Sequence, residues 1–364
     1  MSVDPVRADY RGACVASIVP RILRREPVPW LPEVVLEARV VVLLVLDGLG
    51  WDALQAHPQL MPTLHEMTGG PITTVVPSTT AAALTSITTG LSPAEHGVIG
   101  FRVAVDGDVL NVLGWQMAKA KRSPDPFVVQ RHPPFLGRPV TVVTSSSFRN
   151  SGFTRAHLRD TSFVGYRAES TLVEHLRNLT RGEATFVYSY YPGIDEVAHE
   201  FGLHDGYYTA ELAATDRLVA AVLDALPADA ALVVTADHGQ VHLDPESWLA
   251  LGDVEPYVAF GSGDGRFRYL HAQKGAAEDL AAAAKETFGS RAWVLTRTEL
   301  LDGGSLGPEP SPATRRRVGD VVLAARDDVA FIDPAMPREL GLRSAHGSMT
   351  STEMLVPCLV ARGR

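Results

Sequence analysis

Cysteine is scarce in this chain. Only two of its 364 residues are cysteines, Cys14 and Cys358, and they lie near opposite ends. Two cysteines so far apart form neither a disulfide framework nor a thiolate metal site. We therefore expect a protein of a reducing compartment, the cytoplasm, in which any metal ion is held by nitrogen and oxygen ligands.

Long apolar segments are missing as well. The longest purely aliphatic run, Val40 to Leu46, has seven residues, whereas a membrane-spanning helix needs about 20. Residues 1–15 contain no apolar stretch of the kind that marks a signal peptide. The sequence thus predicts no membrane span and no secretion signal.

Positive charge is in deficit. The 33 Lys and Arg residues against 42 Asp and Glu give a net charge of -9, which disfavours binding to a nucleic-acid duplex or an anionic membrane. An anionic substrate would need local positive charge, from a metal ion or a few arginines. Arg102, Arg266 and Arg268 are candidates for that role, whereas we interpret the run 315–317 as a solvated face.

Apolar segments alternate with helical patterns from residue 40 onward, as expected of an α/β layered sheet. We expect one catalytic domain over residues 1–364, with a small inserted subdomain or cap at 243–345 and a loop-rich region at 102–138. The predicted strands are 40–46, 139–144, 184–189, 231–235 and 355–360, and the predicted helices are 80–89, 170–179, 207–226 and 276–288.

Groups able to bind a metal ion or attack phosphorus follow several of these strands. Ligands of open α/β sheets bind at that edge. A hydroxyl at a helix N-terminus can also meet a phosphate there. The candidates are Asp47, the segment Pro77-Ser78-Thr79-Thr80, the pair Asp195 and His199 at helical i, i+4 spacing, the pair Asp237 and His238, and His346.

Each pattern alone also has a structural explanation. Asp47-Gly48 and the Asp237-His238 pair read as turns that close strands, and a hydroxyl residue that opens a helix is usually its N-cap. Three aspartates, three histidines and a hydroxyl together suit two divalent ions, zinc first, with manganese or iron as alternatives. From the residues alone, Ser78, Thr79 and Thr80 remain equivalent candidates for the nucleophile.

The order of these motifs resembles the alkaline phosphatase superfamily, and within it the nucleotide pyrophosphatase/phosphodiesterase family. The resemblance also rests on Thr89-Gly90-Leu91, Glu95-His96-Gly97 and His346-Gly347. It implies a three-layer α/β/α alkaline-phosphatase-like core with a largely parallel central sheet. It also implies that the nucleophile stands ten residues before Gly90, at Thr80.

The resemblance further implies a ligand set for each ion. Asp47, Thr80, Asp237 and His238 would hold one ion, and Asp195, His199 and His346 the other, whereas His96 would be structural. We therefore expect a metal-dependent phosphodiesterase or nucleotide pyrophosphatase that acts on a small phosphorylated substrate through a phospho-threonine.

One position departs from the family pattern and bears on the substrate class. Many phosphodiesterases of the family carry an asparagine three residues after the nucleophile, where this chain has Ala83. The alternatives are a phosphomonoesterase, phosphonate hydrolase or phosphomutase with the same metal set. From another class, the chain could be a non-catalytic metal-binding protein.

Overall fold

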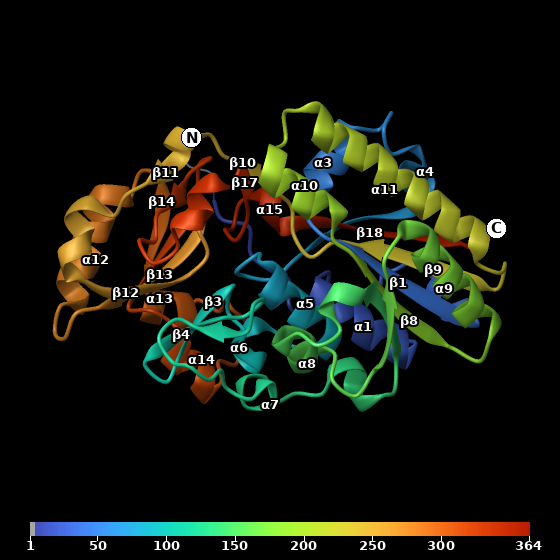
Figure 1. Ribbon diagram of the computed structural model, residues 1–364, viewed down its shortest axis with the longest axis horizontal. Helices are drawn as coiled ribbons and strands as arrows, with labels where there is room; N and C mark the ends of the chain where they lie inside the picture. Colours follow the sequence, from blue (N-terminus) through green and yellow to red (C-terminus); the bar gives the residue numbers. More distant parts are fainter. Residues whose placement is uncertain (1–3) are drawn as a thin grey trace.

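A seven-stranded sheet forms the core of the larger part of the protein, at the right of Figure 1, in a computed structural model that describes residues 4–364. The strand order is β2-β18-β9-β1-β8-β6-β7. The five strands from β9 to β7 are parallel, whereas β18 is antiparallel to both β9 and β2. The strands are β1 (Val40–Leu46), β2 (Thr68–Thr73), β6 (Thr141–Ser145), β7 (Ser162–Tyr166), β8 (Phe186–Tyr191), β9 (Ala230–Thr235) and β18 (Leu355–Arg362).

Helices cover both faces of this sheet, which gives the expected three-layer core (Figure 1). One face carries α1 (Val15–Arg24), α5 (Thr80–Thr89) and α8 (Gly152–His157). The other face carries α3 (Trp51–Ala56), α4 (Pro62–Glu66), α9 (Glu169–Arg181), α10 (Gly193–Phe201) and α11 (Gly206–Ala225). The expected three-layer core with a largely parallel central sheet is confirmed.

The central strand β1 positions the site. All of its residues are buried because it lies between β8 and β9 with helices on both faces. Its last residue, Leu46, pairs with Tyr191 of β8, and Val45 pairs with Thr235 of β9. The residues that follow β1, β8 and β9 therefore come together at one edge of the sheet.

A second sheet lies in the later part of the chain. It is antiparallel, in the order β12-β13-β15-β14, and packs against α12. Its elements are β12 (Val258–Gly263), β13 (Phe267–Ala272), α12 (Ala277–Phe288), β14 (Ala292–Thr296) and β15 (Val321–Ala325). That residues 243–345 form an insertion within a single catalytic domain stays a prediction.

Short elements complete the structure outside the two larger sheets. Part of the region expected to be loop-rich forms a three-stranded sheet that contacts α14 (Figure 1). These elements are β3 (Arg102–Val105), β4 (Asp108–Asn111), β5 (Gln116–Met117), β10 (Val241–His242), β11 (Trp248–Leu249), β16 (Ala330–Phe331), β17 (Ser344–Ala345), α2 (Val34–Glu37), α6 (Pro93–His96), α7 (Pro126–Val129), α13 (Arg297–Asp302), α14 (Pro312–Arg317) and α15 (Ser351–Met354).

The arginines expected to approach a substrate are instead buried in ion pairs. Arg266 binds Glu353 through two nitrogens, Nε and Nη2, each 2.8 Å from a carboxylate oxygen. Arg268 pairs with Glu339, and Arg102 with Asp333. Burying a guanidinium requires such a partner, so these cations hold the connecting segments together.

A membrane-spanning helix is not found among residues 4–364, because none of the helices there combines sufficient length with sufficient apolar character.

Candidate metal centre and nucleophile

A buried acidic cluster forms where β1 and β9 end. Asp47 directly follows β1, and its Oδ1 lies 3.3 Å from Nε2 of His238. Asp237 follows β9, and its Oδ2 lies 3.5 Å from the same nitrogen. Asp47 Oδ1 and Asp237 Oδ2 have no hydrogen-bond partner among the described residues. Both oxygens therefore remain available to a cation.

The hydroxyl of Thr80 contacts this cluster. Thr80 is the first residue of α5, and its Oγ1 lies 3.1 Å from Nε2 of His238. The Ser78 hydroxyl instead donates to the carbonyl of Ser348 and accepts from the amide of Gly347. The buried Thr79 hydroxyl makes no hydrogen bond within residues 4–364. Geometry thus separates three hydroxyls that the sequence left equivalent.

A second group of ligand-type side chains adjoins the first. Asp195 and His199 lie one turn apart on α10, with 3.3 Å between Oδ1 and Nε2. His346 brings its Nε2 within 3.7 Å of the same Asp195 oxygen, and its ring stacks on His238 with centroids 3.5 Å apart. The structure therefore brings all seven candidate residues together, including ligand-type triads formed by Asp47, Asp237 and His238 and by Asp195, His238 and His346.

The three histidines are oriented in the same way. Nδ1 of His238 lies 3.1 Å from the carbonyl oxygen of Gly239, Nδ1 of His199 2.8 Å from that of Ser344, and Nδ1 of His346 2.9 Å from that of Ser78. A carbonyl oxygen accepts only, so each Nδ1 carries the proton. Each Nε2 is then turned toward the cluster, as in histidines that bind metal ions.

Electrostatics within the cluster favour a bound cation. Burial raises the pKa of Asp47, and the nearby carboxylates of Asp237 and Asp195 raise it further. Burial also raises the pKa of Asp237. Burial, followed by the neighbouring His238 and His199, lowers the pKa of His346, so its ring is neutral. Crowded carboxylates and imidazoles form a donor set that suits divalent ions.

Two residues that hold the ligands were missed from the sequence. The phenol of Tyr190 donates to Oδ2 of Asp47, and Nε2 of Gln240 donates to Oδ1 of Asp195. Gln240 in turn accepts from the hydroxyl of Ser344. Their signal in the sequence is weak: Tyr190 stands near the end of a predicted strand, and Gln240 stands two residues after His238.

Glycine is required at position 48 for this packing. Its φ of +78° is left-handed, and a Cβ there would lie 3.2 Å from the Cα of Asp195. The amide of Gly48 also donates to Oδ1 of Asp237. The Asp47-Gly48 turn thus lets three ligand-bearing segments approach one another.

His96 lies outside the cluster, as expected of a structural residue. Its Nδ1 accepts from the amide of Val98, so its Nε2 donates to the hydroxyl of Ser86 on α5. Burial lowers the pKa of His96, which keeps the ring neutral.

Two cavities open beside Thr80. One, of about 240 Å³, is lined mainly by aromatic and aliphatic side chains, including Phe148, Phe153, Tyr188 and Tyr190. The other, of about 200 Å³, lies on the side of His346. Among the residues that the structure describes, no Arg or Lys lines either cavity, whereas carboxylates line both.

Comparisons with known proteins agree with this arrangement. The family model "Type I phosphodiesterase / nucleotide pyrophosphatase" matches residues 41–349. No curated protein sequence matches the chain.

Solved structures share the fold. Murine ectonucleotide pyrophosphatase / phosphodiesterase 5 superposes with a TM-score of 0.67 at 13% identity, over 88% of this chain and 87% of that one. An inactive form of the murine protein, in complex with AMP, gives a TM-score of 0.67 at 14% identity, over 89% and 88%. Phosphonoacetate hydrolase from Sinorhizobium meliloti 1021, in complex with phosphonoformate, gives 0.63 at 21% identity, over 90% and 91%.

The family model spans most of the chain and covers the segments that carry Asp47, Thr80, Asp195, Asp237 and His346. The chain therefore belongs to the type I phosphodiesterase / nucleotide pyrophosphatase family and is a hydrolase of phosphoric ester or pyrophosphate bonds.

Proposed function

We propose that this chain is a metal-dependent phosphodiesterase of the nucleotide pyrophosphatase type that acts through a phosphorylated Thr80. The observation that carries the proposal is the position of the Thr80 hydroxyl. It lies at the N-terminus of α5, 3.1 Å from Nε2 of His238, in a cluster of carboxylates and imidazoles whose free atoms converge.

The donor set fits two divalent ions. We assign Asp47, Thr80, Asp237 and His238 to one ion, and Asp195, His199 and His346 to the other. Nitrogen and oxygen ligands without thiolate favour zinc, with manganese or iron as alternatives. Bound there, such ions supply Lewis-acid stabilisation of the oxygens that enter and leave phosphorus.

The chain itself supplies the nucleophile and its alignment. Oγ1 of Thr80 forms a bond to phosphorus as the bond to the leaving oxygen breaks, and water then displaces Thr80 from phosphorus to regenerate the hydroxyl. The N-terminal end of α5 favours negative charge, both on Oγ1 and on the phosphoryl oxygens. Tyr190 and Gln240 hold Asp47 and Asp195 in place.

The cavities favour a diester whose second substituent is uncharged or cationic. A monoester dianion or a second anionic group would benefit from Arg or Lys, yet none is found in either lining as described. An anionic group would instead meet Glu196 in one cavity or Glu339 in the other. The apolar cavity also offers the hydroxyl of Tyr188, which is buried and has no partner within residues 4–364.

The first test compares p-nitrophenyl substrates, a diester beside a monoester, with the zinc- or manganese-loaded protein. We expect a higher kcat/KM for the diester. A preference for the monoester would keep the metal centre and Thr80 but would transfer the protein to the phosphomonoesterase alternative.

A pair of isosteric variants tests the nucleophile. Thr80→Val should lower kcat by about 10³-fold or more, because it removes the attacking oxygen. The matched control is Thr79→Val, which alters the neighbouring hydroxyl and should retain most activity. Equal losses in the two variants, or diester turnover by Thr80→Val, would contradict the mechanism.

A further inference from the structure

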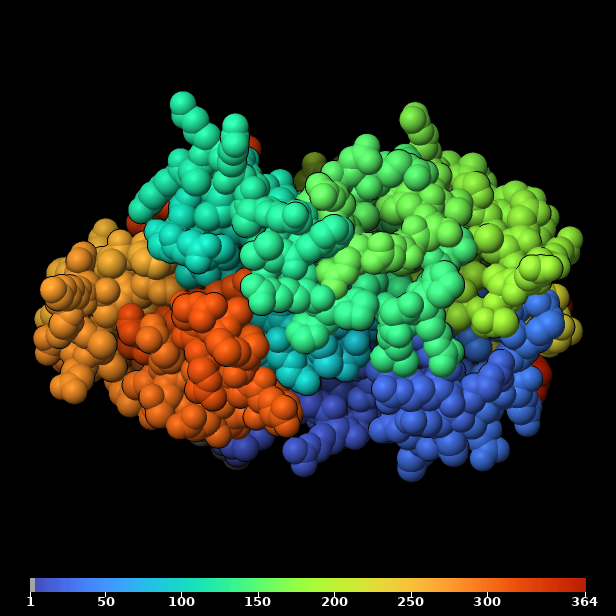
Figure 2. Space-filling model, turned by 90° about the horizontal axis from the view of Figure 1, so that it is seen from below, coloured from blue at the N-terminus to red at the C-terminus, as the bar shows by residue number. Residues whose placement is uncertain are grey.

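A large basic cavity lies apart from the metal centre. It has a volume of about 870 Å³, within the size range of small-molecule sites. Its walls come from α14, the β3–β4 hairpin, residues 124–132 and the second sheet, and it shares no lining residue with the two cavities beside Thr80. Figure 2 shows the orange-red segment that includes α14 beside the teal and green segments of this region.

Guanidinium groups dominate the lining. Five arginines line the cavity, Arg131, Arg297, Arg315, Arg316 and Arg317, against the two carboxylates of Glu95 and Asp106. This excess of positive charge stands in a chain of net charge -9. In the run 315–317, Arg315 and Arg316 are exposed, as expected of a solvated face, whereas Arg317 is buried. All three arginines also contribute to the cavity wall.

Two of these five guanidinium groups already have partners. Arg317 is buried and donates to the carbonyl oxygens of Gly97 and Val129, at 2.6 and 3.1 Å. Arg297 pairs with Asp320 at 3.1 Å. Of the two carboxylates, Glu95 is already engaged, because it accepts from the amide and hydroxyl of Ser92.

Three guanidinium groups have no such partner. The side chains of Arg131, Arg315 and Arg316 make no hydrogen bond or ion pair with any residue from 4 to 364, and they come from two segments distant in the sequence. Burial lowers the pKa of Arg317 to about 10, and the positive charges of Arg316 and Arg131 contribute. The carboxylate of Asp106 acts in the opposite direction, but five guanidinium groups in the lining still outnumber two carboxylates.

We propose that this cavity binds a small molecule that carries a chain of two or more phosphoryl groups, at a site separate from the catalytic centre. Guanidinium groups bind phosphoryl oxygens in a bidentate manner. A chain of phosphoryl groups offers enough oxygens to bind guanidinium groups from both segments at once. This chemistry is common to inorganic polyphosphates and nucleoside polyphosphates.

The apolar part of the cavity wall can distinguish nucleoside polyphosphates from inorganic polyphosphates. The rings of Phe260 and His271 stack with centroids 4.1 Å apart, and Nε2 of His271 lies 2.9 Å from the hydroxyl of Ser262. Phe260 is only half-buried, so its ring can contact a nucleobase. Tripolyphosphate lacks this group, whereas ATP has it.

Calorimetric titration of the full chain with tripolyphosphate and with ATP tests the proposal. The protein is used both zinc-loaded and freed of metal ions, with its folding checked by circular dichroism. We expect saturable binding that persists without metal ions and weakens as salt is raised. Equal affinities for the two probes would mean that the site recognises the phosphate chain alone. Tighter binding of ATP would mean that the aromatic wall also contacts the nucleobase. Absence of saturable binding of either probe up to about 1 mM would overturn the proposal.

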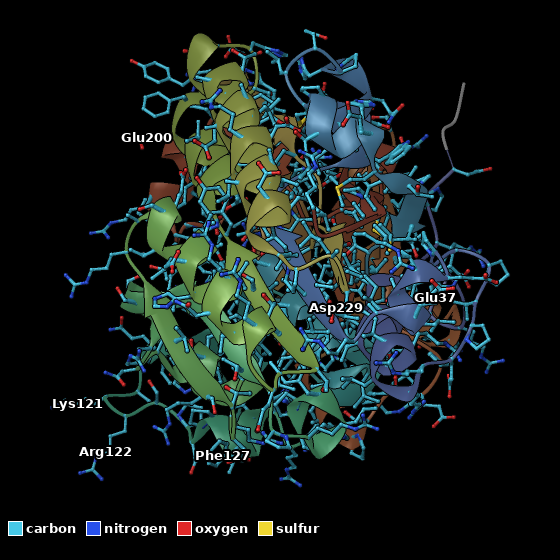
Figure 3. All side chains as sticks on the ribbon, turned by 90° about the vertical axis from the view of Figure 1, so that its right-hand side faces the viewer. Glu37, Lys121, Arg122, Phe127, Glu200 and Asp229 are labelled. Carbon is cyan, nitrogen blue, oxygen red and sulfur yellow. The ribbon has the colours of Figure 1, made fainter. Side chains whose placement is uncertain are left out.

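A charge-matched pair of double variants localises the site. Arg315→Gln with Arg316→Gln should raise the dissociation constant at least tenfold, because each lost charged hydrogen bond weakens binding by about tenfold. Arg24→Gln with Arg181→Gln removes the same charge from exposed arginines outside the cavity. This control should change the dissociation constant by less than twofold. If the two double variants raised the dissociation constant equally, binding would reflect a diffuse attraction to the net charge of the protein, and the proposed site would be overturned. Lys121 and Arg122, which extend into solvent in Figure 3, are unsuitable controls because their loop adjoins the cavity.

Discussion

The phenol of Tyr190 donates a hydrogen bond to Oδ2 of Asp47, across the neighbouring strands β8 and β1. The other carboxylate oxygen, Oδ1, faces Nε2 of His238 and lacks a hydrogen bond among the described residues. Tyr190 thus fixes the rotamer of Asp47 and leaves one oxygen for a metal ion. Because β1 and β8 are central parallel strands, this orientation is built into the register of the sheet.

Removal of this phenol should weaken metal binding. Tyr190→Phe keeps the ring but no longer orients Asp47, and loss of such a partner typically costs 10- to 100-fold in metal affinity. The measurement is zinc titration against a chromophoric chelator. Tyr191→Phe is the matched control, because its hydroxyl binds Glu169 and Glu211 instead. Equal zinc affinities in the two variants would refute a positioning role for Tyr190.

Gln240 should act in the same way on the second ligand group. Gln240→Leu removes the donor to Asp195 and leaves the Ser344 hydroxyl without its acceptor. We expect a fall in kcat that added zinc partly restores, because the Asp195 side chain is then less well oriented. Gln273→Leu alters an exposed glutamine that donates to the carbonyl of Val258. It should change neither kcat nor the response of kcat to added zinc. If added zinc did not restore the kcat of Gln240→Leu, the result would argue against a role of Gln240 in orienting Asp195.

The buried pair of Arg266 and Glu353 should dominate local stability. Arg266→Met leaves the Glu353 carboxylate buried without its cation, which costs about 3–5 kcal/mol in the free energy of unfolding. Glu353 also accepts from the amide of Ser348, two residues after His346, so we expect weaker metal binding as well. Urea denaturation measures the first effect.

An exposed ion pair provides the comparison. Arg291→Met breaks a pair with Asp327 whose side chains are about half exposed, and it should cost less than about 1 kcal/mol. Similar costs for the two variants would show that burial does not determine the contribution of these pairs.

Asp264 should make stability depend on pH. Burial raises its pKa to about 7, despite a hydrogen bond from the amide of Phe101 and the nearby Arg268. Because the folded-state pKa lies above the unfolded one, the contribution of Asp264 to stability is complete below about pH 4 and is lost as pH rises through 7.

Asp264→Asn removes this dependence. We expect the variant to gain stability over the native protein between about pH 4 and 7, up to an upper limit of about 4 kcal/mol from the size of the pKa shift. Thermal unfolding at a series of pH values measures the difference. Asp253→Asn, which makes the same change at an exposed position, is the matched control. If the stability difference between Asp264→Asn and the native protein did not change with pH, the raised pKa of Asp264 would be contradicted.

Much of the fold was predictable because local patterns and tertiary packing agree. The aliphatic run 40–46 becomes β1 with unchanged bounds, and the run of small residues 80–89 becomes α5 with unchanged bounds. By contrast, β7, with the pattern Ser-Phe-Val-Gly-Tyr, was not predicted. It is an edge strand that is only partly buried, so its sequence lacks a continuous apolar signal.

The sequence by itself determined the order of the chemical groups. The ligand candidates stand after strands or Gly turns, and that order is enough to indicate the family and to single out Thr80 once the family motif is applied. These features are local, because a carboxylate after a buried strand and a hydroxyl at the start of a helix are set by neighbouring residues.

Only the tertiary structure decided what surrounds those groups. Tyr190 reaches Asp47 through the pairing of β8 with β1, and Gln240 reaches Asp195 across 45 residues of sequence. The arginines 315–317 looked like an isolated charged run until folding placed them in the lining of the same cavity as Arg131. Such contacts depend on strand register and on the packing of distant segments, and no local pattern of residues encodes either of them.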